Sequence, residues 1–165
     1  MPVPNDILAA DRDRVRSDWD AVLLWRPALW RGEELFEFPR PVPRVRIHET
    51  WDAAKFKVPL VDGDTLSGGS RNGVDITLTG QIVSDTADPL VLLESLAELR
   101  AALHVTGDDA KAWLFVYRDA DAEIYRHFRG CSTVRFEYDL IDGLAIQYEA
   151  VIHADDPTLY DTAPE

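Results

Sequence analysis

Cysteine and long apolar runs are nearly missing from this chain of 165 residues. Cys131 is the single cysteine, which excludes an intrachain disulfide and any cysteine-rich metal site. The longest apolar runs, such as residues 21–25 and 89–93, are far shorter than the roughly 20 residues that span a bilayer. The sequence therefore predicts no membrane span and a fold that is held together by packing.

Basic residues are scarce, with 17 Lys and Arg against 30 Asp and Glu and a formal net charge of −13. This balance argues against a DNA-binding surface, because clustered Lys and Arg supply the affinity for phosphate. An acidic ring around a conduit would repel phosphate and let DNA slide past, whereas the plainer interpretation of the charge is solubility. Residues 1–6 lack the basic and apolar regions of a secretory signal, so we expect synthesis and folding in a cytoplasm.

No constellation of catalytic or ligand-binding residues stands out, so we expect no metal, no cofactor and no enzymatic activity. The Asp62 and Asp64 pair lacks the remaining ligand spacing of a calcium loop, and a turn is the better interpretation. Cys131 lies near His127 without a family signature for a Cys–His nucleophile, so a small core or interface cysteine is favoured. Carboxylates are numerous enough for a glycosidase pair, but the sequence cannot pair them. The four histidines lack helical metal-ligand spacing: His48, His104, His127 and His153.

The composition, 46% hydrophobic and 28% charged, suits one compact soluble domain. Residues 74–83 alternate apolar and polar side chains as a half-buried strand, in which Gly80 predicts a bulge or a close backbone approach. Asp88 before Pro89 predicts a helix start, and the helix is expected to run to about Val105 with Gly107 as its stop. One apolar stripe predicts that this helix covers a sheet: Leu92, Leu96, Leu99 and Leu103.

The second half of the chain predicts a meander of antiparallel strands. Residues 113–117 are apolar on both faces and predict a core strand, followed by strands at 124–129 and 133–140 on either side of Gly130. Asp142 and Gly143 predict a two-residue type I′ turn into a last strand at 144–152. Upstream, residues 21–25 predict an early strand with no evident partner.

Two irregular segments are candidates for contacts with other molecules. Pro39, Pro41 and Pro43 predict an extended linker or arm. A surface loop that crosses the end of the domain is the favoured interpretation, and an arm that reaches a neighbouring subunit is the alternative. Residues 62–73 hold four glycines and predict a long hairpin loop. Trp51 is an expected interface anchor. We expect both Trp51→Ala and deletion of residues 39–43 to impair assembly and leave the fold intact.

The order of these pieces resembles that of siphophage distal tail proteins. The resemblance is carried by residues 58–63, 71–82, 90–103, 113–118 and 154–160. It implies a β-sandwich covered by one helix, with six copies closing into a ring around the DNA path of the virion tail. It also implies the tail tube protein and the tip or hub protein as neighbours, with genomic DNA passing through without specific binding.

The expected fold class is therefore mainly β (α+β), an antiparallel β-sandwich covered by a single helix with an extended N-terminal arm. Residues 1–43 form the polar segment and arm, as part of the same domain or of an interface, and residues 44–165 form the tail-protein domain. The alternatives are another tail ring subunit (tube, terminator or baseplate) and a monomeric β-sandwich that binds a ligand or glycan through exposed Trp residues. The expected interface residues are Pro39, Pro41, Pro43, Trp51, Asp62, Gly63, Arg71, Asp156, Pro157 and Tyr160.

Overall fold

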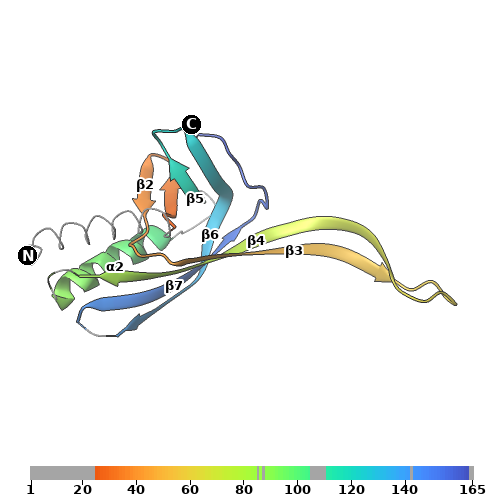
Figure 1. Cartoon of the computed structure of the whole chain (residues 1–165), viewed down its shortest axis with the longest axis horizontal. Helices are drawn as coiled ribbons and strands as arrows, with labels where there is room; N and C mark the ends of the chain where they lie inside the picture. The colour runs from red at the N-terminus through yellow and green to blue at the C-terminus, as the bar shows by residue number, and fades with distance from the viewer. Residues whose placement is uncertain (1–24, 85, 87, 105–110, 142, 164–165) are drawn as a thin grey trace, which may run out of the picture.

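A computed structural model describes residues 25–84, 86, 88–104, 111–141 and 143–163. In these ranges a single antiparallel sheet has the strand order β2-β1-β5-β6-β7-β4-β3, and one helix packs against it (Figure 1). The expected class, mainly β with an antiparallel sheet and one covering helix, is confirmed. The elements are β1 (Ala28–Arg31), β2 (Glu34–Glu37), β3 (Arg44–Phe56), β4 (Thr65–Val83), α2 (Pro89–Leu103), β5 (Ala112–Asp119), β6 (Ile124–Leu140) and β7 (Ala145–Ala154).

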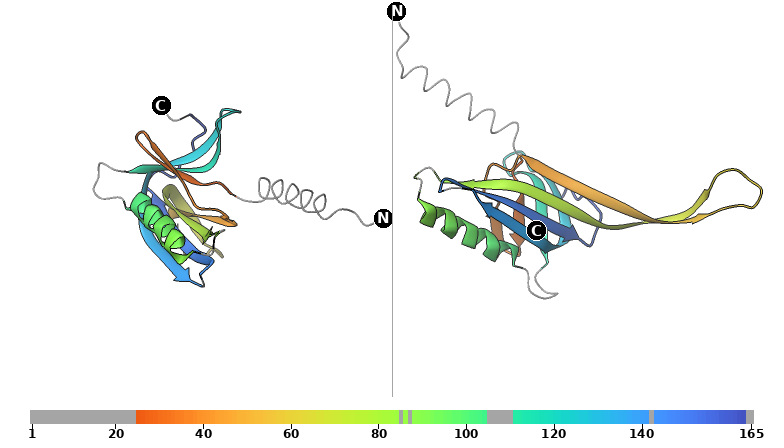
Figure 2. Two further views of the ribbon diagram at one scale, coloured as in Figure 1. Left: turned by 90° about the vertical axis from the view of Figure 1, so that its left-hand side faces the viewer. Right: turned by 90° about the horizontal axis from the view of Figure 1, so that it is seen from below.

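Strand β6 joins the two halves of the sheet. Its first part pairs with β5 and its second part with β7, and Cys131 is the residue that pairs with both, opposite Ala112 and Ala154. Gly130, immediately before this point, has a φ of 65°, which a glycine adopts without steric cost. The two halves are turned relative to each other, so the sheet is folded as in a sandwich (Figure 2). The sequence instead predicted two separate strands, because Gly130 was taken for a turn.

Helix α2 forms as its capping residues and leucine stripe predict. Asp88 accepts a hydrogen bond from the Leu90 N–H at 2.9 Å, and Pro89 begins the helix. The helix ends at Leu103, and the predicted stop at Gly107 lies outside the described residues. All four stripe leucines are buried. Among the described residues, no helix is long and apolar enough to cross a bilayer.

The paired strands β4 and β7 supply a large part of the hydrophobic core from one face. Ten consecutive pairs run from Val74↔Ala154 to Val83↔Ala145, and alternate pairs are buried on one side. The inner side chains face the helix, and most of the outer ones are polar, such as Thr77 and Gln147. The buried residues of this ladder are Val74, Ile76, Leu78, Ile82, Ile146, Tyr148, Ala150, Ile152 and Ala154.

Gly80 is where the backbone of β4 approaches Tyr148, so the expected close approach is confirmed. A Cβ at Gly80 would lie 2.4 Å from Cζ and Oη of Tyr148. That ring is 1% exposed, and its hydroxyl donates to the Pro39 carbonyl at 2.8 Å. The tyrosine therefore fills the space that a side chain at position 80 would need.

Several predicted strand boundaries need correction. Residues 21–24 lie outside the described part of the chain, and Trp25 makes an isolated bridge with Val42. The hairpin of β1 and β2, closed at Gly32 with a φ of 65°, was not predicted, because each strand has only four residues. The two-residue type I′ turn is wrong: the last pair of β6 and β7 is Leu140↔Ile146, which leaves a longer connection.

The largest correction concerns residues 62–73, because β4 begins at Thr65 and pairs with β3 through most of the predicted loop. The pairing of β3 with β4 has two register shifts, and each contains a glycine of the predicted loop. Gly68, with a φ of 70°, lies within one shift, and Gly73 lies within the other. An extra residue in one strand forms a bulge, and a glycine with positive φ is one way to build it. The turn at the end of the hairpin is thus residues 57–64.

Replacing Gly80 by alanine should lower the free energy of unfolding by about 1–3 kcal/mol, because the new methyl group overlaps the buried Tyr148 ring. Chemical denaturation measures this change. Gly69→Ala is the matched control, because nothing lies within 4 Å of its Cβ position. A Gly80→Ala protein as stable as the control would contradict the packing described for this strand pair.

Candidate assembly interface

The hairpin of β3 and β4 projects from the body of the molecule (Figure 1). Strand β4 pairs with β7 only from Val74 onward, so residues 65–73 of β4 have β3 as their single strand partner. These nine residues correspond to roughly 30 Å of extended chain. Such a two-stranded ribbon is marginally stable in water by itself and presents free backbone groups on both edges.

Apolar side chains on the projecting hairpin are exposed to an unusual degree. Trp51, at the base of the hairpin, is 59% exposed. Leu66 is 63% exposed, and Leu60 in the turn is fully exposed. Phe56, Val58 and Val61 are also exposed. A cluster of exposed large apolar residues on one element marks an interaction surface. This hairpin is therefore the candidate assembly interface, and it contains the predicted residues Trp51, Asp62, Gly63 and Arg71.

Arg71 ties the base of the hairpin to the segment that follows β7. Its Nη2 donates to Glu49 Oε1 at 3.0 Å and to the Pro157 carbonyl at 3.1 Å. Both side chains of the ion pair are partly solvated, which limits its contribution to stability. The contact still fixes where the hairpin leaves the body, and it joins two predicted interface residues, Arg71 and Pro157.

The segment of residues 156–162, here named the C-terminal latch, is held against β6. Tyr160 and His127 exchange two backbone hydrogen bonds, of 2.9 and 3.0 Å. The Tyr160 hydroxyl donates to Asp156 Oδ2 at 2.6 Å, and this bond lowers the pKa of Asp156 and raises the pKa of Tyr160. Two further predicted interface residues, Asp156 and Tyr160, therefore stabilise the latch itself.

His127 and Arg129 form the core of the latch contact. The imidazole is buried and stacks on Trp113, with ring centroids 4.6 Å apart, while the Arg129 guanidinium lies over the rings of Trp113 and Tyr160 at 4.4 and 4.0 Å. Arg129 Nε donates to His127 Nε2 at 3.3 Å, which leaves the proton of the neutral ring on Nδ1. Burial is the main cause that lowers the pKa of His127, and the charge of Arg129 lowers it further. The charge of Asp161 acts in the opposite direction and raises it.

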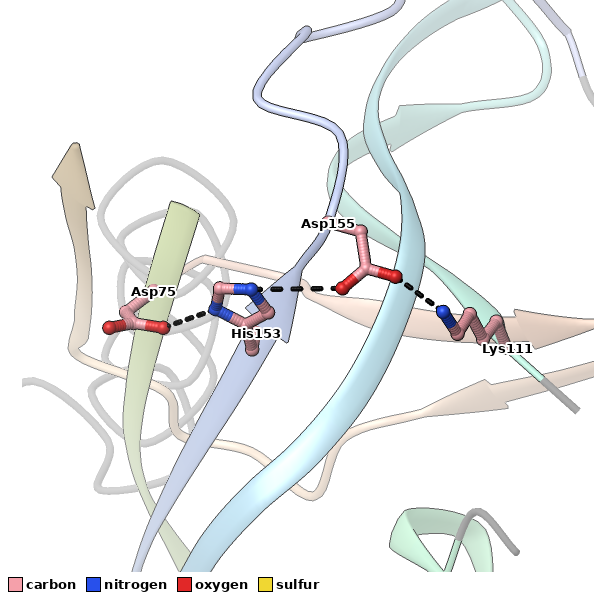
Figure 3. Close-up of polar contacts among 4 residues, drawn as sticks. All are labelled: Asp75, Lys111, His153 and Asp155. Atoms are coloured by element: carbon pink, nitrogen blue, oxygen red, sulfur yellow. Dashed lines mark hydrogen bonds and ion pairs between the residues drawn. The ribbon is translucent and has the colours of Figure 1, made fainter. Parts of the chain in front are cut away.

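A string of polar side chains crosses the sheet beside the latch (Figure 3). A hydrogen bond of 2.7 Å joins Nδ1 of His153 on β7 to Oδ1 of Asp75 on β4. Nε2 of the same imidazole lies 3.7 Å from Oδ1 of Asp155. Asp155 also pairs with Lys111 at the start of β5. A Cβ at Gly73 would lie 2.6 Å from the His153 ring, so the glycine leaves room for this arrangement. The string connects three strands where the hairpin begins.

Among the described residues, no hydrogen bond joins a Ser or Cys side chain to a histidine ring. Ser132 lies opposite His153 in the β6–β7 register, yet no hydrogen bond joins the two side chains. Burial raises the pKa of Cys131 to about 12, and its thiol is directed to the Phe128 carbonyl, so the expected core cysteine is confirmed. Among the described residues, no group of three or more His, Cys, Asp or Glu side chains is placed to hold a metal ion.

The proline segment lies against the body of its own chain. Val42 is completely buried, the Pro41 carbonyl accepts from the Gln81 N–H at 2.9 Å, and the Pro39 carbonyl accepts from Tyr148. Deletion of residues 39–43 would remove these contacts, so the structure leads us to expect that this deletion destabilises the fold. Pro43 is exposed. An interface role for Pro39, Pro41 and Pro43 stays a prediction.

The structure thus gathers seven of the ten predicted interface residues in two connected places, the hairpin and the latch. Asp62 and Gly63 lie in the turn, Trp51 and Arg71 at the base of the hairpin. No local pattern predicted a role for His127 and Arg129, because their contacts depend on β5 and the latch lying on either side of them. Asp156, Pro157 and Tyr160 lie in the latch. The three predicted residues outside both places are those of the proline segment.

Comparison of the chain with known proteins finds relatives by structure and not by sequence. No family model matches, and no curated protein matches. The crystal structure of the Dit protein of phage SPP1, described as a paradigm of the hub adsorption apparatus in phages that infect Gram-positive bacteria, is similar over 82% of this chain. Its TM-score is 0.59 at 13% identity. The match covers 52% of the Dit protein, so this chain spans about half the length of that structure.

A second similar structure is a protein of the tail of an empty GTA particle with C6 symmetry. It has a TM-score of 0.50 and 15% identity, and the match covers 84% of this chain and 96% of that one. At these identities the likeness shows the fold. The chain therefore shares the fold of the SPP1 Dit protein and of this tail protein.

The buried His127 predicts a dependence of stability on pH. Its pKa in the folded protein lies below the ordinary value of 6.5, so the unfolded chain binds the proton first as the pH falls. The contribution of neutral His127 to the free energy of unfolding is therefore fully present above about pH 6.5. It is lost as the pH falls through the pKa that His127 has in the folded protein, with a slope of at most about 1.4 kcal/mol per pH unit.

Denaturation of the His127→Gln variant between pH 5 and 8 should show a shallower loss of stability than the unmodified protein. His48→Gln, at an exposed position of β3, is the matched control and should retain the full slope. Equal slopes for the unmodified protein and both variants would contradict the assignment to His127.

Proposed function

We propose that this protein is a ring-forming structural subunit of a phage tail, and specifically the distal tail protein that joins the tail tube to the tip complex. The observation that carries the proposal is the projecting β3–β4 hairpin with its exposed apolar side chains. In a monomer this apolar surface stays in contact with water, which is unfavourable, whereas a neighbouring subunit would bury it. The similarity of fold to the SPP1 Dit protein supports the choice of the distal tail position.

The sheet supplies a second reason for ring assembly. Its two edge strands are β2 and β3, which lie at opposite ends of the strand order. Contact between different patches of identical subunits is heterologous, and such contacts close into rings when the rotation permits. The six-fold symmetry of the similar GTA tail supports six copies here. In this proposal the protein is a virion component, with the tube protein on one side of the ring and the tip or hub protein on the other.

The polar face of the sheet is suited to line the DNA path. On the side away from α2, neighbouring strands present Thr77, Thr79, Gln81 and Gln147, with Glu137, Asp139 and Glu149 beside them. Arg135 pairs with both Glu137 and Glu149, so it is not free to bind phosphate. Arg44 and Arg46 of β3 lie on the same side, opposite Thr79 and Thr77, so the charge of this face is mixed. In this proposal DNA passes it without specific binding.

The alternative of a monomeric glycan-binding sandwich depended on exposed tryptophans. Trp30 and Trp113 pack edge to face at 4.7 Å, and Trp113 also stacks on His127, so these two rings stabilise the fold. Trp25 and Trp51 are exposed, at 44% and 59%. Nothing in the described residues places these two side by side as a platform for a sugar.

The ring proposal is tested by light scattering of the purified full chain over a wide concentration range. We expect a closed, six-subunit mass for the unmodified protein. A variant in which residues 55–66 are replaced by Asn-Gly, joining the register pair Ala54 and Ser67, should remain monomeric with an unchanged free energy of unfolding. The reason is that the removed residues pack on no other part of the described body.

Val134→Ser, at another exposed apolar position outside the hairpin, is the matched control and should assemble like the unmodified protein. Assembly of the truncated variant would show that the hairpin is not the contact. A full chain that is monomeric at every concentration would contradict the ring and favour the monomeric binding module.

A further inference from the structure

A groove lies between the β1–β2 hairpin and helix α2. It has a volume of about 500 Å³, and its lining is mainly apolar. Leu29, Leu35 and Phe36 form the strand side, and Ala101 and Ala102 the helix side. Arg31 joins the two sides, because its Nη2 donates to the Ala102 carbonyl. The groove therefore has a fixed shape and an apolar surface to cover.

Two exposed carboxylates line the groove without an ion-pair partner in the described part of the subunit. Glu34 on the strand side and Glu98 on the helix side face the groove from opposite walls, and neither has an ion-pair partner among the described residues. An occupant that supplies cations at the rim of the groove would complement both carboxylates.

The turn region of the β3–β4 hairpin has this chemistry. Lys55 and Lys57 stand on either side of Phe56, and neither lysine has an ion-pair partner in the described part of the chain. Leu60, the most exposed apolar residue of the described chain, lies at the end of the turn.

We propose that the groove receives the β3–β4 hairpin turn of a second copy of this chain. The turn belongs to another copy because the hairpin extends away from the body on the side opposite to α2, so it cannot fold back to its own groove (Figure 1). Apolar side chains of the turn cover the apolar lining, and Lys55 and Lys57 pair with Glu34 and Glu98. This inference rests on the proposed ring function and specifies the two surfaces that meet in it.

Charge reversal with rescue tests the pairing in the full chain. Glu34→Lys with Glu98→Lys in the groove, or Lys55→Glu with Lys57→Glu in the turn, should each raise the concentration for half-assembly by at least about tenfold, since like charges then face each other. All four changes in one chain should restore assembly toward the unmodified level. Light scattering gives the concentration for half-assembly.

The outcomes separate this inference from the ring proposal. If the unmodified protein assembles and the reversals have no effect, or if the fourfold variant assembles no better than either pair, the groove is not the receptor while the ring proposal stands. If the unmodified protein never assembles, both proposals fail. Unfolding midpoints of all variants are measured alongside, and because all four side chains are exposed we expect these to change little.

Disulfide trapping identifies the occupant directly. A chain carrying Leu60→Cys mixed with a chain carrying Leu35→Cys should form a cross-linked heterodimer under mild oxidation, and Leu60→Cys mixed with Val134→Cys should not. The native Cys131 does not compete, because it is 1% exposed. Cross-linking to position 134 in preference to position 35, or no cross-link in an assembled sample, would assign the groove to another occupant and overturn the proposal.

Discussion

The ten-pair ladder between β4 and β7 is the constraint on which the rest of the molecule depends. Its inner face is apolar without interruption, and this face is what the leucine stripe of α2 covers. An amphipathic helix of 15 residues is marginal in water, so the helix forms because the ladder offers it a surface. The ladder also fixes where the chain leaves the body, since β4 continues beyond its last pair with β7 into the hairpin and β7 continues into the latch.

The two continuations are stabilised by different means. The latch is held by a buried histidine, a guanidinium between two rings and paired backbone groups, so it belongs to the folded subunit. The hairpin has only its own ladder, and its apolar side chains remain in water. Arg71 connects the two, through Glu49 on one side and the Pro157 carbonyl on the other. A rigid base and an unsupported end are the arrangement expected of an element whose stabilising partner is another molecule.

The sequence predicted those elements whose signals are local. The Asp88 and Pro89 pair set the start of the helix, the alternation at residues 74–83 identified the ladder strand, and Gly80 indicated the close approach to Tyr148. What the sequence did not reveal depends on long-range pairing. Residues 65–73 contain glycines typical of a loop, and only their pairing with β3 makes them a strand. Likewise, the proline segment predicted a surface loop or an arm to a neighbour, and only the fold shows that Val42 is buried and that two carbonyls of the segment accept hydrogen bonds from β4 and β7.

The candidate interface follows the same division. Arg71, Asp156, Pro157 and Tyr160 come from distant parts of the sequence, and their connection appears only in the fold. The glycines of the hairpin then acquire a physical role. Gly68 and Gly73 lie in bulges, which bend and twist a ribbon more than regular pairing does. Because the groove and the hairpin turn lie on opposite sides of the body, contact between them is head to tail, and such a contact yields a ring only at the correct rotation per subunit. The bulges set the direction of the hairpin, so in this proposal they determine whether successive subunits close into a ring or continue as a filament.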